Sequence, residues 1–100
     1  MSARYQLTPS AQADVEQICA FVAEDSIEGA LRVHEALENA FAQLALMPQM
    51  GHQREDLTDR PVRFWSVFSY LVVYDPVSLP LAVIAVLHGA RDVEELLKGI

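Results

Sequence analysis

Cysteine and long apolar runs are both scarce in this sequence. A single cysteine, Cys19, leaves no partner for an intramolecular disulfide, and three histidines beside it make no ligand set for structural zinc. The longest unbroken apolar run, residues 81–87, is too short to span a bilayer, and no apolar stretch follows a basic amino-terminal start as in a signal peptide. We therefore expect a reduced, cytoplasmic protein with no metal, no cofactor and no membrane partner.

Positive charge is scarce as well. Seven Lys and Arg stand against fourteen Asp and Glu, which gives a formal net charge of −7. A protein that binds nucleic acid by neutralising phosphates needs a net basic face, so direct nucleic-acid binding is not expected. Residues 1–50 hold two basic and seven acidic residues, and residues 51–100 hold five basic and seven acidic ones. An acidic helical half and a less acidic second half are therefore predicted.

What the sequence does have is the composition of one globular domain. The chain has 100 residues, of which 52% are hydrophobic and 21% charged. Repeats and low-complexity tracts are absent from it. A domain of this size can bury one two-layer core without disulfides or metals. We expect a single domain over residues 1–100.

Two amphipathic helices are predicted in the first half. Residues 4–7 alternate between polar and apolar as in a short strand, and Thr8-Pro9 supplies an N-cap and a first-turn proline. The helix that follows runs to about Glu24, with apolar residues at steps of three and four. Asp25-Ser26 supplies a turn and the cap of a second helix, which ends before Pro48. Helices joined by so few residues lie antiparallel.

The second half has the pattern of strands. After an irregular loop over residues 48–61, two segments rich in β-branched and aromatic residues, 62–67 and 70–74, are separated only by Phe68-Ser69, which indicates a tight hairpin. Residues 81–87 are apolar on both faces, as in a strand that is central in a sheet or covered on both sides. Residues 90–97 resemble a short terminal helix.

These elements predict an α+β fold with the order β-α-α-β-β-β. The antiparallel helix hairpin packs on one face of a small antiparallel sheet, because each element must bury its apolar side against another. The early strand joins the sheet at an edge, and a short C-terminal helix follows.

Several segments, in their order and spacing, resemble the ParE branch of the ParE/RelE toxin superfamily of bacterial type II toxin–antitoxin systems, which includes plasmid stabilisation proteins. The segments that carry the resemblance are Tyr5-Gln6-Leu7-Thr8-Pro9 with Ala11, Ala13 and Asp14; residues 44–48 followed by Met50-Gly51; residues 63–74; and Val86-Leu87-His88-Gly89-Ala90-Arg91-Asp92. The resemblance implies a toxin silenced by a cognate antitoxin, within a higher-order toxin–antitoxin heteromer.

The two branches of the superfamily differ in what they do. RelE-like members cut messenger RNA on the ribosome, whereas characterised ParE members inhibit DNA gyrase. Metal-free RNA cleavage needs clustered Lys, Arg, Tyr or His. This chain has Val62 and Phe64 where the RelE pattern has lysines, Leu71 where it has an arginine and Leu97 where it has a tyrosine; only Arg91 remains. We expect a non-enzymatic gyrase inhibitor; the alternatives are a RelE-type ribonuclease and a degenerate member that only binds antitoxin.

Five residues are candidates for binding target or antitoxin, and no catalytic residue is assigned. They are Arg54, Arg60, Arg63, His88 and Arg91. Each also has a structural interpretation, since a strand often exposes one polar face, Arg91 can pair with acidic neighbours, and His88 can hydrogen-bond a nearby loop. Cys19 borders an apolar stripe and is expected to fill the core.

Overall fold

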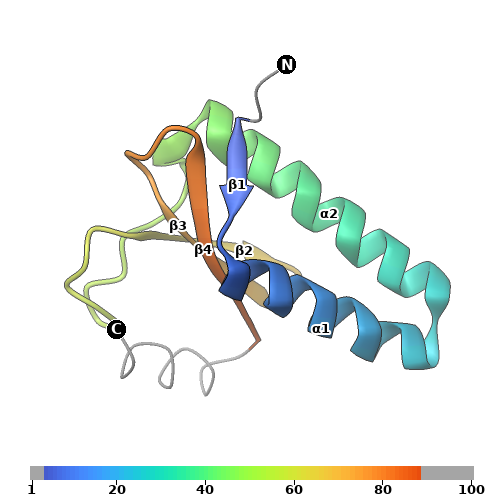
Figure 1. The fold of residues 1–100 in the computed structure, drawn as a ribbon. Coiled ribbons are helices and arrows are strands. Elements are labelled where there is room, and N and C mark those ends of the chain that lie inside the picture. Colours follow the sequence, from blue (N-terminus) through green and yellow to red (C-terminus); the bar gives the residue numbers. More distant parts are fainter. Residues whose placement is uncertain (1–3, 89–100) are drawn as a thin grey trace.

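The structure, a computed structural model, describes residues 4–88 and confirms the α+β class (Figure 1). The predicted terminal helix over residues 90–97, and Arg91 with it, lie outside this range. The elements in chain order are β1 (Tyr5–Leu7), α1 (Pro9–Asp25), α2 (Ile27–Leu46), the short 3-10 helix η1 (Pro48–Met50), β2 (Arg63–Val67), β3 (Tyr70–Asp75) and β4 (Leu81–His88). The order β-α-α-β-β-β is the predicted one.

Both helices begin at the caps that the sequence indicates. The Thr8 hydroxyl accepts a hydrogen bond from the Ala11 amide at 3.1 Å, and Pro9 occupies the first turn of α1. Ser26 has extended backbone, ends α1 and caps α2, where its hydroxyl accepts from the Gly29 amide at 2.9 Å. With a single residue between them, the two helices lie side by side and antiparallel (Figure 1).

The sheet has the strand order β1-β4-β3-β2. The antiparallel meander of β2, β3 and β4, the central place of β4 and the edge position of β1 are as predicted. However, β1 pairs in parallel with β4, from Tyr5 opposite Leu81 to Leu7 opposite Val83, so the sheet is mixed and not wholly antiparallel. The helix pair returns the chain to the end of the sheet where β1 starts, so the third strand of the meander runs in the direction of β1 (Figure 1).

The sheet is buried on both faces. One face packs against the helices, and its core holds Val15, Ile18, Leu37, Phe41, Leu44, Val72, Tyr74 and Val83 among others. The other face carries a smaller cluster of Phe64, Val73, Ala85 and Leu87, covered by Leu57 and Val62 of the loop before β2. The loop therefore serves as a second layer, which explains why β4 is apolar on both sides.

β4 contains a β-bulge near the point where β1 ends and α1 begins. Val73 pairs with Ala85 but Tyr74 pairs with Val83, so Ile84 is an extra residue in a β-bulge. β1 has ended at this point, and α1 takes over its role: the Thr8 hydroxyl donates to the Ile84 carbonyl at 2.9 Å, and the Asp14 carboxylate accepts from the Val86 amide at 3.0 Å. The backbone of β4 is thus bonded beyond the reach of β1.

Candidate functional site

A groove of about 500 Å³ lies between α1, α2 and β1. Its inner surface is formed by buried or half-buried side chains, namely Tyr5, Leu7, Val15, Cys19, Leu37 and Phe41. Exposed polar residues line its rim, namely Gln6, Gln12, Glu16, His34 and Glu38. Because the lining includes two carboxylates and no Lys or Arg, the groove combines an apolar floor with an acidic rim.

Electrostatics within the groove follow from this lining. The His34 Nδ1 lies 3.0 Å from a Glu38 carboxylate oxygen, one helical turn away. Burial raises the pKa of the Tyr5 phenol, and the charge of Glu38 raises it further. Burial also raises the pKa of the Cys19 thiol, so this side chain is protonated at neutral pH and is no nucleophile. The chemistry of this groove is suited to binding an apolar, basic surface.

Arg63, the first residue of β2, has a structural partner. Its Nη1 donates to the Gly51 carbonyl at 2.7 Å. The Gly51 amide donates at 2.9 Å to the hydroxyl of fully buried Tyr74, and that hydroxyl donates to the Pro48 carbonyl at 2.7 Å. Arg63 and Tyr74 are paired across β2 and β3, so together they fasten the turn after α2 to the sheet.

This fastening, which we call the Gly51 latch (Pro48, Gly51, Arg63 and Tyr74), leaves no space for a larger residue at position 51. A Cβ there would meet the Tyr74 hydroxyl and lie 2.9 Å from the Phe64 carbonyl oxygen. Burial raises the pKa of Tyr74, although the Gly51 amide and the Arg63 charge act in the opposite direction. Arg63, one of the residues predicted to bind a partner, is therefore hydrogen-bonded within the fold.

Arg54 and Arg60 lie in the loop before β2. The Arg54 guanidinium makes two bonds to the Asp56 carboxylate, Nε to Oδ1 at 3.0 Å and Nη2 to Oδ2 at 2.9 Å. This pairing lowers the pKa of Asp56 and raises the pKa of Arg54. Arg60 is exposed, with its amide bonded to the Thr58 hydroxyl at 3.1 Å. Both arginines lie on the solvent side of the loop.

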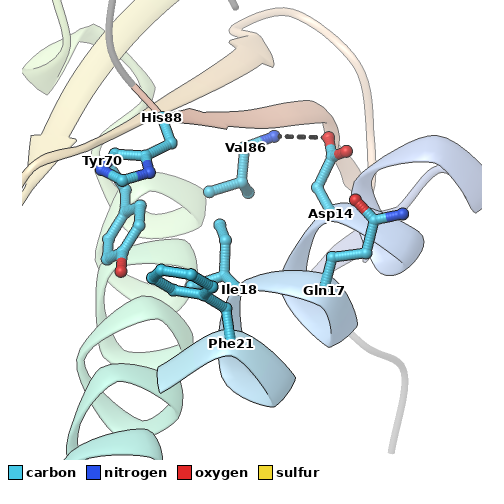
Figure 2. Close-up of a pocket in the computed structure, with 7 residues that line it drawn as sticks. All are labelled: Asp14, Gln17, Ile18, Phe21, Tyr70, Val86 and His88. Carbon is cyan, nitrogen blue, oxygen red and sulfur yellow. Dashed lines mark hydrogen bonds between the residues drawn. The ribbon is translucent and has the colours of Figure 1, made fainter. Parts of the chain in front are cut away.

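His88 lies at the end of β4, in a pocket of about 190 Å³ between that strand and α1 (Figure 2). Its imidazole is 5.0 Å, centre to centre, from the ring of Tyr70 on β3. Figure 2 shows the Tyr70 hydroxyl at the end of the side chain away from this imidazole, toward Phe21 and Ile18 of α1. The arrangement is a ring contact beside an apolar wall and does not pair the two groups for proton transfer.

The structure does not gather the described candidates into one patch. Arg63 is opposite Tyr74 at one end of the sheet, whereas His88 is opposite Tyr70 at the other end. Arg54 borders a hollow with Ser66 and Leu71, on the sheet face away from the helices. Among residues 4–88, no three His, Cys, Asp or Glu side chains come together as a metal site, and no helix is long and apolar enough to cross a membrane.

Two features escape the sequence patterns. The acidic rim of the groove comes from Glu16 and Glu38, which are far apart in sequence and do not suggest a shared site. The only indication in the sequence was the excess of acidic residues in the first half of the chain. Phe68 in the hairpin turn has a positive φ of 54°, and the signal was a bulky side chain where tight turns favour Gly, Asn or Asp.

Comparisons with known proteins agree with this fold. The model of a family described as the ParE toxin of the type II toxin–antitoxin system parDE matches residues 5–93. A solved structure described as the chromosomal ParDE TA system from P. aeruginosa is similar, with a TM-score of 0.66 and 18% identity over 84% of this chain and 92% of that chain. At that identity the likeness concerns the fold. The search of curated proteins gives no match.

Proposed function

Because this chain belongs to the ParE toxin family of type II toxin–antitoxin systems, we propose that it arrests growth by binding DNA gyrase in the cytoplasm and is silenced by a cognate antitoxin. Gyrase is proposed on the resemblance to the ParE branch, whose characterised members inhibit that enzyme. The toxin and antitoxin are proposed to form a higher-order heteromer.

The dispersed placement of cations and acid–base groups supports binding over RNA cleavage. A metal-free ribonuclease needs such groups around one phosphate. Here Arg63 is bonded to the Gly51 carbonyl, Arg54 is bonded to Asp56, and His88 lies at the far end of the sheet from Arg63. Binding a protein surface needs no such convergence.

The groove between α1, α2 and β1 carries the antitoxin part of the proposal. An amphipathic helix can place apolar residues on Tyr5, Leu7 and Cys19, the half-buried side chains of the groove. Lys or Arg at the edges of that helix would meet Glu16 and Glu38 on the rim. We therefore propose that the antitoxin contributes a basic amphipathic helix to this groove.

Inducible expression with and without the neighbouring antitoxin gene tests the function. We expect growth arrest that the antitoxin relieves, together with loss of gyrase supercoiling by the purified toxin and with intact messenger RNA. Cleaved messenger with normal supercoiling would overturn the gyrase target in favour of a ribonuclease. Normal growth with antitoxin binding retained would identify a non-toxic member of the family.

A charge-reversal pair tests the groove. In the double variant Glu16→Lys, Glu38→Lys we expect the affinity for antitoxin to fall at least about tenfold, because like charges would face each other across the rim. The control, Glu24→Lys with Glu28→Lys, makes the same change in net charge on exposed residues that do not line the groove. Equal loss in both double variants would show that net charge, not the groove, governs antitoxin binding.

A further inference from the structure

Phe68 in the turn between β2 and β3 has an unusual combination of backbone and exposure. The turn is two residues long, since Val67 and Tyr70 are paired across it. Phe68 has φ of 54° and is the only residue other than glycine with positive φ among those the structure describes. The residue is 69% exposed. A bulky aromatic residue in this backbone region is a genuine outlier.

Packing within the chain does not account for this choice of residue. Glycine adopts positive φ without a steric penalty and asparagine tolerates it, so either would satisfy the turn better than phenylalanine. With most of its surface in solvent, the Phe68 ring gains little from burial to offset the cost. Residues held in unfavourable backbone conformations tend to lie at functional sites. The turn therefore exposes the ring at the end of two paired strands.

The surroundings of Phe68 indicate what kind of surface it meets. The ring borders a hollow of about 270 Å³ whose other walls include Arg54, Leu57, Ser66 and Ser69. Asp56 fixes the Arg54 guanidinium through two of its five N–H donors, which leaves donors for an acceptor on a partner. Arg and aromatic residues are the side chains that most often dominate protein interfaces.

We propose that Phe68 and Arg54 anchor the chain on its protein target, an inference that rests on the proposed function. The partner has an apolar pocket that takes the Phe68 ring and a carboxylate at the edge of that pocket that binds Arg54. The antitoxin groove between α1, α2 and β1 shares no lining residue with this hollow. Target and antitoxin therefore bind at separate places on the chain.

Two substitutions at Phe68 test the anchor without weakening the fold. Phe68→Gly and Phe68→Asn remove the ring and put in residues that favour positive φ, so the thermal midpoint is expected to stay unchanged or rise. We expect the affinity for purified DNA gyrase to fall at least about tenfold and supercoiling inhibition to fall with it. Affinity for antitoxin should not change. Arg54→Gln should weaken gyrase binding by a smaller factor.

Val77→Asn is the matched control, because Val77 is 80% exposed in the turn between β3 and β4, outside this hollow. Gyrase binding by Phe68→Asn equal to that of the native chain would overturn the inference, as would an equal loss in Val77→Asn. A fall in thermal midpoint parallel to the loss of affinity would show a structural role, and weaker antitoxin binding would assign the ring to that partner. If the native chain itself fails to bind gyrase, the proposed target falls, and the inference falls with it.

Discussion

The hydroxyl of Tyr74 holds the turn after α2 in place, and its removal by Tyr74→Phe should destabilise the fold measurably. The hydroxyl accepts from the buried Gly51 amide at 2.9 Å and donates to the Pro48 carbonyl at 2.7 Å. Leaving a buried amide without an acceptor costs about 1–3 kcal/mol, and losing the second bond costs about 0.5–1.5 kcal/mol. We expect the free energy of unfolding to fall by about 1.5–4.5 kcal/mol, a large share of the stability of a small domain.

Urea denaturation followed by circular dichroism measures this change. The slope of the unfolding free energy against urea concentration should not change, because the substitution hardly alters the surface that becomes exposed on unfolding. The control is Tyr5→Phe, which removes the hydroxyl of a half-buried tyrosine. A loss below about 0.5 kcal/mol in Tyr74→Phe would refute the reasoning and show that the turn holds itself without the hydroxyl.

Three further predictions concern position 51, the Asp14 carboxylate and the two tyrosines with raised pKa values. Gly51→Ala should lower the thermal midpoint, and Tyr74→Phe should not rescue it, because a Cβ at position 51 still lies 2.9 Å from the Phe64 carbonyl oxygen; a full rescue in thermal scans would show that the Tyr74 hydroxyl alone limits the space. Asp14→Ala should cost about 1–3 kcal/mol in urea denaturation by leaving the Val86 amide without an acceptor, whereas an unchanged midpoint would mean that water replaces the carboxylate. Burial raises the pKa values of Tyr5 and Tyr74 in the folded chain, so the unfolded chain loses its phenol protons first. The free energy of unfolding should therefore fall as pH rises above about 10. Urea denaturation at pH 8 and at pH 11 measures this change, and equal stability at the two pH values would contradict it.

Local signals predicted the elements well because their causes are local. Thr8 and Ser26 begin helices through bonds to amides three residues ahead, so the sequence pattern contains the whole interaction. The β-branched and aromatic residues in 62–67 and 70–74 likewise indicate two paired strands. The direction of β1 relative to β4 depends on the path of some seventy intervening residues, and no local pattern contains it.

The site was less predictable for the same physical reason. Arg63 in a strand can face solvent or a partner, and its bond to the Gly51 carbonyl depends on where the loop after α2 returns to the sheet. The groove rim requires α1 and α2 to place Glu16 and Glu38 together, which follows from the angle of packing and not from composition. At Phe68 the predicted length of the turn was correct and a bulky side chain there was already unusual, but only the structure shows that this residue itself has positive φ.

The carboxylate of Asp14 on the Val86 amide also bears on how the molecule behaves at high concentration. β1 covers only residues 81–83 of β4, and the rest of this side of β4 has no strand beside it among residues 4–88. Strand edges without a covering element recruit extended chains and start aggregation. A negative side chain anchored in the middle of that edge must be displaced before another strand can pair there. Asp14 therefore occupies a backbone donor that an added strand would need, and we expect Asp14→Ala to increase aggregation at high protein concentration.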